Sequence, residues 1–248
     1  MSDDRPALSI VLPVYNEADS LGPLWTELAG ILPTLAESVE VIFVDDGSTD
    51  GSADVLHRLA KDDRRIRLLR FEANAGLSAA VYAGLQATRG RLVATMDSDL
   101  QSDPRDIAML MTHLRDADAV VGWRFIRHDS WLKRLSSRIA NGIRKAVTGD
   151  HVHDSACTLR VMRGECVSAM PPYTGMHRFM PTLLKIAGFR VAQVRVNHRA
   201  RRFGRSKFGV SDRAFSAFAD LLVVRWMMAR RLRYRIAERI EAAPEDPR

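Results

Sequence analysis

The segment Asp97-Ser98-Asp99-Leu100-Gln101 is the part of this chain whose residue types point most directly to chemistry. Two carboxylates and an amide stand at alternate positions directly after the apolar run LVATM. Their oxygens are hard ligands of the kind that divalent cations such as Mg²⁺ prefer. A buried strand ending here would present them at the carboxyl edge of a sheet, where α/β proteins bind ligands. Asp and Ser are also common turn residues, so this segment alone leaves an ordinary turn open.

Two earlier apolar runs end in polar side chains of the same kind. The first, VLPVYNE, contains Pro13, Tyr15 and Glu17, and the second, VDDGSTDGS, contains Asp46 and Gly47. Because proline cannot donate to a sheet ladder, the first strand is predicted to end or become irregular at Pro13. A strand exit followed by a capped helix explains each loop almost as well. Three such strand ends in succession favour a site for a nucleotide and its metal.

The elements that must position these residues follow from the hydrophobic pattern. Up to about residue 122, short apolar runs alternate with helical stretches, which predicts a mostly parallel sheet covered on both faces. Strands are predicted at residues 8–14, 39–44, 66–69, 92–96 and 119–121, and helices at 20–35, 52–61, 77–88 and 104–115. Further on, the pattern predicts a basic amphipathic helix at 131–147, strands at 158–162 and 189–196, a helix near 179–187, and a long helix at 212–239.

Composition limits the class of protein. The 37 Lys and Arg against 30 Asp and Glu give a net charge of +7, which favours an acidic partner such as a nucleotide, a nucleic acid or an anionic membrane. Cys157 and Cys166 form no metal-binding spacing, so a reducing compartment is expected. No apolar run approaches the ~18 residues of a membrane span, and the start of the chain lacks the apolar core of a signal peptide. We therefore expect a cytoplasmic protein.

The three polar strand ends, together with Asn74-Ala75-Gly76-Leu77 between the second and the third, resemble the family 2 glycosyltransferases of the GT-A fold. The resemblance covers residues 8 to about 210. It implies an α/β nucleotide-diphospho-sugar transferase sandwich at 1–210, while the residue pattern itself predicts a basic amphipathic C-terminal helix and tail at 211–248. It also implies a nucleotide-diphosphate sugar as donor, with Mg²⁺ or Mn²⁺ held by Asp99 and Gln101. The implied nucleotide-sugar pocket comprises Pro13, Tyr15, Glu17, Asp46, Asp97, Arg201 and Lys207.

The second half of the chain resembles one subgroup, the polyprenyl-phosphate glycosyltransferases of the dolichol-phosphate mannose synthase type. The matching segments are VGWR at 121–124, RIAN at 138–141, Asp154, and RRFGRSKF at 201–208. The resemblance implies catalytic roles for Asp97, Asp99, Arg124 and Arg138, and contact with the acceptor phosphate for Arg124, Arg138, Arg201 and Ser206. A phosphate monoester has a second pKa of about 6, so this acceptor is already an oxyanion at neutral pH. It needs guanidinium groups rather than a carboxylate base.

Two features leave the acceptor side open. Cys157 stands where relatives usually have a glycine, which puts the shape of the acceptor pocket in question. Residues 214–234 interleave aromatic and aliphatic residues with arginines. This composition suits a helix in the headgroup region of an anionic membrane, although a core-packed helix with a basic face is the alternative. We expect peripheral docking at the inner face of the plasma membrane through this helix and residues 131–147.

Other glycosyltransferase activities, nucleic-acid binding and a scaffold role are the alternatives to transfer onto a prenyl phosphate. A family 2 enzyme of cell-envelope glycan synthesis, acting on a saccharide hydroxyl, would need a base such as Asp154 or His153. A processive synthase is disfavoured because Leu222 stands in place of the Gln of the QxxRW pattern. No nucleic-acid partner is expected, because no recognised binding motif accompanies the basic residues. A silent scaffold is disfavoured by the retention of Asp97, Asp99 and Gln101. The base and sugar of the donor stay open.

Overall fold

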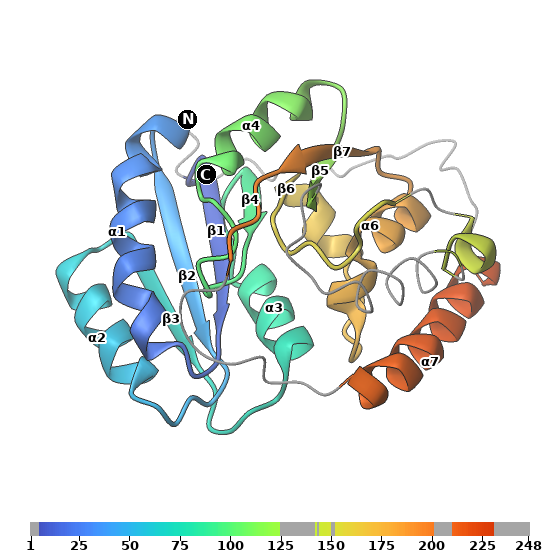
Figure 1. Cartoon of the computed structure of the whole chain (residues 1–248). Coiled ribbons are helices and arrows are strands. Elements are labelled where there is room, and N and C mark those ends of the chain that lie inside the picture. The colour runs from blue at the N-terminus through green and yellow to red at the C-terminus, as the bar shows by residue number, and fades with distance from the viewer. Residues whose placement is uncertain (1–4, 125–141, 143, 150–151, 201–209, 231–248) are drawn as a thin grey trace, which may run out of the picture.

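A mixed sheet between two layers of helices forms the centre of the protein (Figure 1). The computed structural model describes residues 5–124, 142, 144–149, 152–200 and 210–230, with side chains described only from 219 onward in the last range. Within these residues the sheet has seven strands in the order β3-β2-β1-β4-β6-β5-β7. The strands are β1 Leu8–Val14, β2 Val39–Asp45, β3 Ile66–Arg70, β4 Leu92–Thr95, β5 Ala119–Arg124, β6 Arg160–Arg163 and β7 Val191–Val196.

Strand direction confirms the predicted mostly parallel sheet. β1 pairs in parallel with β2 and β4, β2 with β3, and β5 with β7. The exception is β6, which runs antiparallel to β4 on one side and to β5 on the other. Because β6 is reversed, its first residue lies at the edge where β4 and β5 end.

Helices cover both faces of the sheet. One hydrophobic cluster joins the sheet to α1 (Ala18–Leu35), α2 (Ser52–Asp62) and α4 (Asp106–Thr112), which continues into the short 3₁₀ helix η1 (His113–Arg115). The other joins it to α3 (Leu77–Gln86), the 3₁₀ helix η2 (Gly164–Ala169), α6 (Met176–Ala187) and α7 (Val210–Ala229). Residues 142 and 144–148 are helical too. The remainder of the predicted 131–147 helix lies outside the described residues, as does the predicted C-terminal helix beyond residue 230.

The central strands read as continuous apolar runs because both faces of the sheet are covered. In β1, Leu8, Ile10 and Leu12 belong to the cluster with α1, whereas Val11 belongs to the cluster with α3. All seven residues of β1 are buried. The alternation of side chains along the strand thus stabilises both layers at once.

The predicted irregularity at Pro13 is wrong, since β1 continues in register with β2 through Pro13 to Val14. The carbonyl of Val11 accepts a hydrogen bond from Met96, so the backbone of Val11 and Pro13 faces β4. The pairing with β4 ends at Val11 and Thr95. Pro13 therefore lies beyond the last β4 pair, where its missing N–H breaks no ladder hydrogen bond.

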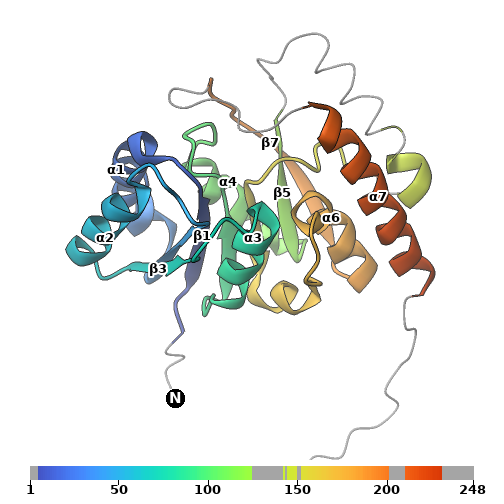
Figure 2. The same cartoon turned by 90° about the horizontal axis from the view of Figure 1, so that it is seen from below.

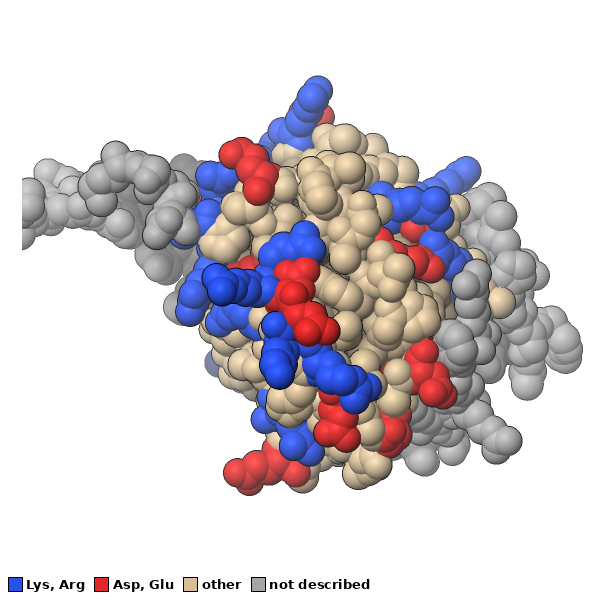
Figure 3. All heavy atoms as spheres, turned by 90° about the vertical axis from the view of Figure 1, so that its left-hand side faces the viewer, with Lys and Arg blue, Asp and Glu red and all other residues tan. Residues whose placement is uncertain are grey.

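α7 lies along α6 at one side of the molecule (Figure 2). Within the described residues, no helix is both long and apolar enough to cross a membrane. Figure 3 shows the face on the side of α1 and α2, where acidic and basic side chains are interspersed. On that face neither the acidic nor the basic side chains form a continuous patch.

Candidate active site

The three polar strand ends lie side by side because β2, β1 and β4 are adjacent and parallel. Hydrogen bonds to backbone carbonyls join them: the amide of Asp46 donates to the carbonyl of Val14 over 2.8 Å, and the side-chain hydroxyl of Ser98 donates to the carbonyl of Pro13 over 2.8 Å. The structure therefore brings the segment at 15–17, Asp46 and the segment at 97–101 to one sheet edge. This is the arrangement that a nucleotide site of an α/β protein requires.

The first of these loops, Tyr15 to Glu17, is bound to the loop after β2. Asn16 adopts a left-handed conformation with φ of 52°. Its amide donates to the hydroxyl of Ser48 over 2.9 Å, and its side-chain oxygen accepts from the amide of Thr49 over 2.8 Å. The amide of Glu17 donates to the hydroxyl of Ser52 over 2.9 Å. Tyr15 and Glu17 are partly exposed, whereas Pro13 is buried in the sheet.

Asp46 holds the loop that precedes α3. Its carboxylate accepts hydrogen bonds from the amides of Ala75 at 2.7 Å and Gly76 at 3.0 Å, and from the side chain of Asn74 at 2.9 Å. Burial raises the pKa of Asp46, although these bonds act in the opposite direction. Next to it, Gly47 has φ of +68°, and a Cβ there would lie 2.5 Å from the backbone carbon of Ala73. Asp46 and Gly47 therefore set the distance between two loops of the site.

The third loop carries the candidate metal ligands. Asp97 is half-buried and Asp99 is buried. Burial, followed by the negative charge of Asp99, raises the pKa of Asp97 to about 6. The charge of Asp99 thus opposes the ionisation of Asp97, and a divalent cation at these oxygens would offset that repulsion.

A strand-like contact fixes the other end of this loop. The amide of Arg199 donates to the carbonyl of Gln101 over 2.8 Å, and Ser102 pairs with His198 in an isolated antiparallel bridge. In the described part of the chain, no group of three or more His, Cys, Asp or Glu side chains could hold a metal. Two Asp and one Gln fit Mg²⁺ or Mn²⁺ when substrate oxygens and water complete the coordination.

A paired arginine lies at the end of β5. The Nε of Arg124 donates to Oδ2 of Asp154 over 2.7 Å, and its Nη2 donates to Oδ1 over 2.9 Å. The side chains are 19% and 5% exposed. Burial alone would lower the pKa of Arg124, but the hydrogen bonds and charge of Asp154 raise it above its ordinary value. Arg124 is thus a permanent, oriented cation.

Arg160 is a site residue that the sequence interpretation missed. It begins β6, opposite Thr95 of β4 and Val121 of β5, and is 2% exposed. Its Nη2 donates to the carbonyls of Ser155 and His177, while its Nε has no hydrogen-bond partner in the described part of the chain. Burial lowers the pKa of Arg160, and the negative charge of Asp97 acts against that effect. A single charge inside the apolar segment CTLRVM was the signal available in the sequence.

Two questions about the acceptor side are left open by the sequence: the role of His153 and the shape of the pocket at Cys157. The ring of His153 stacks on Trp123 with centroids 4.5 Å apart, and its Nδ1 lies 3.1 Å from Oε1 of Gln193. Cys157 is 1% exposed, and a Cβ on Gly122 would lie 2.9 Å from its sulfur. The Cys157 side chain thus fills space that Gly122, on the neighbouring strand, leaves open.

Four predicted site residues, Arg138, Arg201, Ser206 and Lys207, lie outside the described residues. Their assignment to phosphate binding stays a prediction.

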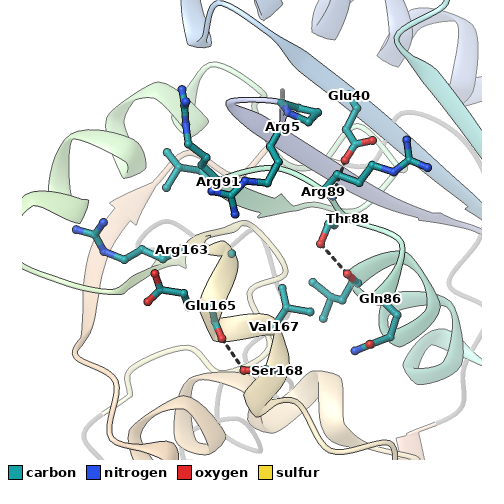
Figure 4. Close-up of a pocket in the computed structure, with 15 residues that line it drawn as sticks. Arg5, Glu40, Gln86, Thr88, Arg89, Arg91, Arg163, Glu165, Val167 and Ser168 are labelled. Atoms are coloured by element: carbon teal, nitrogen blue, oxygen red, sulfur yellow. Dashed lines mark hydrogen bonds between the residues drawn. The ribbon is translucent and has the colours of Figure 1, made fainter. Parts of the chain in front are cut away.

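A cavity of about 1040 Å³ lies at the opposite edge of the sheet (Figure 4). Its lining includes residues 5–6 before β1, Glu40 of β2, the end of α3, residues 88–92 leading into β4, and residues of η2. Arg5, Arg91 and Arg163 lie on one side of it, with Glu165 beside Arg163 (Figure 4). Because the polar strand ends are at the other edge, this cavity is separate from the candidate active site.

Fold and site together define an α/β nucleotide-diphospho-sugar transferase of the GT-A type. The chain belongs to glycosyl transferase family 2, whose family model, Glycosyl transferase family 2, matches residues 9–169. It is 37% identical over 227 residues to a dodecaprenyl-phosphate galacturonate synthase of Rhizobium johnstonii, covering 89% of this chain and 67% of that protein. It is 35% identical over 205 residues to an undecaprenyl-phosphate 4-deoxy-4-formamido-L-arabinose transferase of Edwardsiella ictaluri, covering 82% and 63%. The chain therefore spans about two thirds of the length of these relatives.

Solved structures support the fold. Glucosyl-3-phosphoglycerate synthase of Mycobacterium tuberculosis, in complex with Mn²⁺, UDP and glucosyl-3-phosphoglycerate, matches with a TM-score of 0.65 at 20% identity, over 90% of this chain and 80% of that one. A mannosyltransferase of Pyrobaculum calidifontis, in complex with GDP-mannose and Mn²⁺, matches with a TM-score of 0.63 at 20% identity, over 93% and 66%. The predicted GT-A fold is confirmed.

Proposed function

We propose that this chain transfers a sugar from a nucleotide-diphosphate sugar to a polyprenyl phosphate, with inversion at the anomeric carbon. The observation that carries the proposal is the position of Arg124, an oriented guanidinium at the same sheet edge as Asp97 and Asp99. The two relatives named above support it, since both are named as acting with a prenyl phosphate. A buried cation at the same sheet edge as the candidate metal ligands suits an acceptor that carries a negative charge.

The donor would lie across the three strand ends. In this proposal Pro13, Tyr15, Glu17 and Asp46 shape the nucleoside end, with Asp46 acting through the loop that it holds. Asp97 lies toward the diphosphate, and Asp99 and Gln101 hold Mg²⁺ or Mn²⁺. When bound, the cation supplies charge stabilisation for the leaving diphosphate. Arg201 and Lys207 are proposed to close on the same phosphates.

The reaction needs no proton transfer. The phosphate oxyanion of the acceptor attacks C1 of the sugar, a C1–O bond forms on one face, and the bond from C1 to the diphosphate breaks on the other. Arg124, with Arg138, Arg201 and Ser206, is proposed to hold the acceptor phosphate and balance its charge. A side-chain base is therefore unnecessary, and the contacts of Asp154 and His153 are consistent with other roles.

Membrane contact is proposed through α7. Among the described residues, the exposed large apolar side chains are Leu222, Val223 and Trp226, all on α7 and spaced to share one face. Arg225 and Arg230 are exposed beside them. This combination suits a helix in the interface of an anionic membrane. We place the protein at the inner face of the plasma membrane, with residues 1–210 as the catalytic domain and 211–248 as the basic helix and tail.

The test of this function is a product assay. Purified protein is incubated with undecaprenyl phosphate, Mn²⁺ or Mg²⁺, and UDP-glucose, UDP-galacturonic acid, UDP-N-acetylglucosamine or GDP-mannose in turn. We expect a glycosylated lipid phosphate with at least one donor, its loss with a chelator, and a roughly 100-fold lower rate with Asp99→Asn. Transfer to a soluble saccharide, with no glycolipid from any donor, would contradict the acceptor assignment.

A further inference from the structure

The pair formed by Arg124 and Asp154 has a geometry that fixes the guanidinium in one plane. Two parallel hydrogen bonds of 2.7 Å and 2.9 Å run from Nε and Nη2 to the two carboxylate oxygens. A third, from the amide of Arg124 to Oδ2 at 3.4 Å, holds the same carboxylate against the end of β5. A bidentate pair of this kind restricts both rotation and translation of the guanidinium.

The pair leaves one nitrogen of Arg124 for another anion. Within the described residues, Nη1 makes no hydrogen bond, whereas Nε and Nη2 are both directed at Asp154. The negative charges of Asp154 and, more weakly, of Asp97 both act on Arg124. One edge of the guanidinium is therefore occupied by Asp154, and Nη1 is on the edge that is left.

The same contacts make Asp154 a poor candidate for a general base. It is 5% exposed, and each of its oxygens accepts a hydrogen bond from the fork of Arg124. A base must turn an oxygen toward the hydroxyl that it deprotonates. Here, accepting a proton would break a buried ion pair, which is costly.

We propose that Asp154 is a positioning residue. It holds Arg124 so that Nη1 donates to the acceptor phosphate near the loop formed by residues 97–101. This inference rests on the proposed function, because it assumes an acceptor that carries a phosphate. It assigns Asp154 no contact with the substrate. In this proposal Asp154 acts on the acceptor phosphate through Arg124, so we expect the effects of changing the two residues to be non-additive.

The test is a double-mutant cycle with Asp154→Asn, Arg124→Lys and the double variant. The first readout is the dissociation constant of farnesyl phosphate, a soluble prenyl phosphate, in the presence of UDP and Mn²⁺, and the second is kcat/KM with undecaprenyl phosphate. We expect each single variant to lose about 100-fold in kcat/KM, and the double variant to lose no more than Arg124→Lys alone. Asp154→Asn should retain the wild-type shape of the pH profile.

Asp118→Asn is the matched control. Asp118 immediately precedes β5 at its other end and accepts a similar fork from Arg190, at 3.1 and 3.3 Å. The Asp118→Asn substitution should leave both readouts unchanged. Circular dichroism shows whether every variant is folded. Multiplicative losses in the double variant, or loss of the acidic limb of the pH profile in Asp154→Asn, would overturn the positioning role. Absence of farnesyl phosphate binding by the wild type would overturn it as well, whereas glycolipid formation by the wild type tests the proposed function separately.

Discussion

Several polar residues at the strand ends hold the loops of the site to one another. Asp46 binds the loop before α3, and Asn16 binds the loop after β2. Asp154 binds Arg124. Residue type alone did not distinguish such residues from those that contact substrate, because a carboxylate suits a backbone amide as well as a metal or a ribose. Their contacts in the fold make the distinction.

Gly47 illustrates this at a single position. Its φ of +68° disfavours any other residue, and a Cβ would lie 2.5 Å from the backbone of Ala73. We expect Gly47→Ala to lower the free energy of unfolding by about 3 kcal/mol, from the left-handed conformation and the added clash. Urea unfolding, followed by circular dichroism, measures this change in the free energy of unfolding.

Gly51→Ala is the control for that substitution. Gly51 also has a positive φ, of +90°, but nothing lies within 4 Å of its Cβ position. Its substitution should cost only about 1 kcal/mol. Equal costs at the two positions would show that the close approach of the loops to each other at Gly47 is unimportant.

Among the secondary-structure elements, the sequence predicted the parallel strands well because both faces of the sheet are buried and the apolar runs are continuous. β5 extends further than predicted, to Arg124 rather than residue 121, because Gly122, Trp123 and Arg124 pair in register with β7. The apolar pattern gave no sign of that pairing.

The direction of β6 was likewise not predictable, because periodicity shows which residues are buried and not which strands are neighbours. β6 lies between β4 and β5 and runs against both. That reversal brings Arg160 to the site edge and explains why the sequence interpretation did not include it.

α7 is the element on which the membrane proposal depends. Its Leu222 and Trp226 are 52% and 62% exposed. If they enter the membrane interface, replacing both by serine should weaken binding to anionic liposomes at least about tenfold, because each buried apolar side chain contributes on the order of 2 kcal/mol. Co-flotation with vesicles containing phosphatidylglycerol measures this.

Two controls accompany the liposome experiment. Ala229→Ser changes an exposed residue of the same helix without removing a large apolar group, so binding should be retained. High salt should weaken binding of the wild type, because the arginines are screened. Flotation that is unaffected by the double serine substitution would remove α7 from the membrane contact.

For the whole molecule, the sheet separates two regions of different character. The edge where β1, β2 and β4 end holds the carboxylates. The same edge holds the cations Arg160, at the start of β6, and Arg124, at the end of β5. The opposite edge holds the arginine-lined cavity. The carboxylates and the oriented cation thus lie at one edge of the sheet, and we propose that the cation is there to bind a phosphate nucleophile.

The most direct measurement compares undecaprenyl phosphate with undecaprenol as acceptors, in the same detergent, with the donor that supports turnover. The two lipids share the prenyl chain and differ in the phosphate. We predict glycosylation of undecaprenyl phosphate and none of undecaprenol, detected by mass spectrometry of the lipid product. Comparable transfer to undecaprenol would contradict a phosphate-binding role of Arg124. A hydroxyl acceptor would need a base and carries no negative charge for the guanidinium to bind.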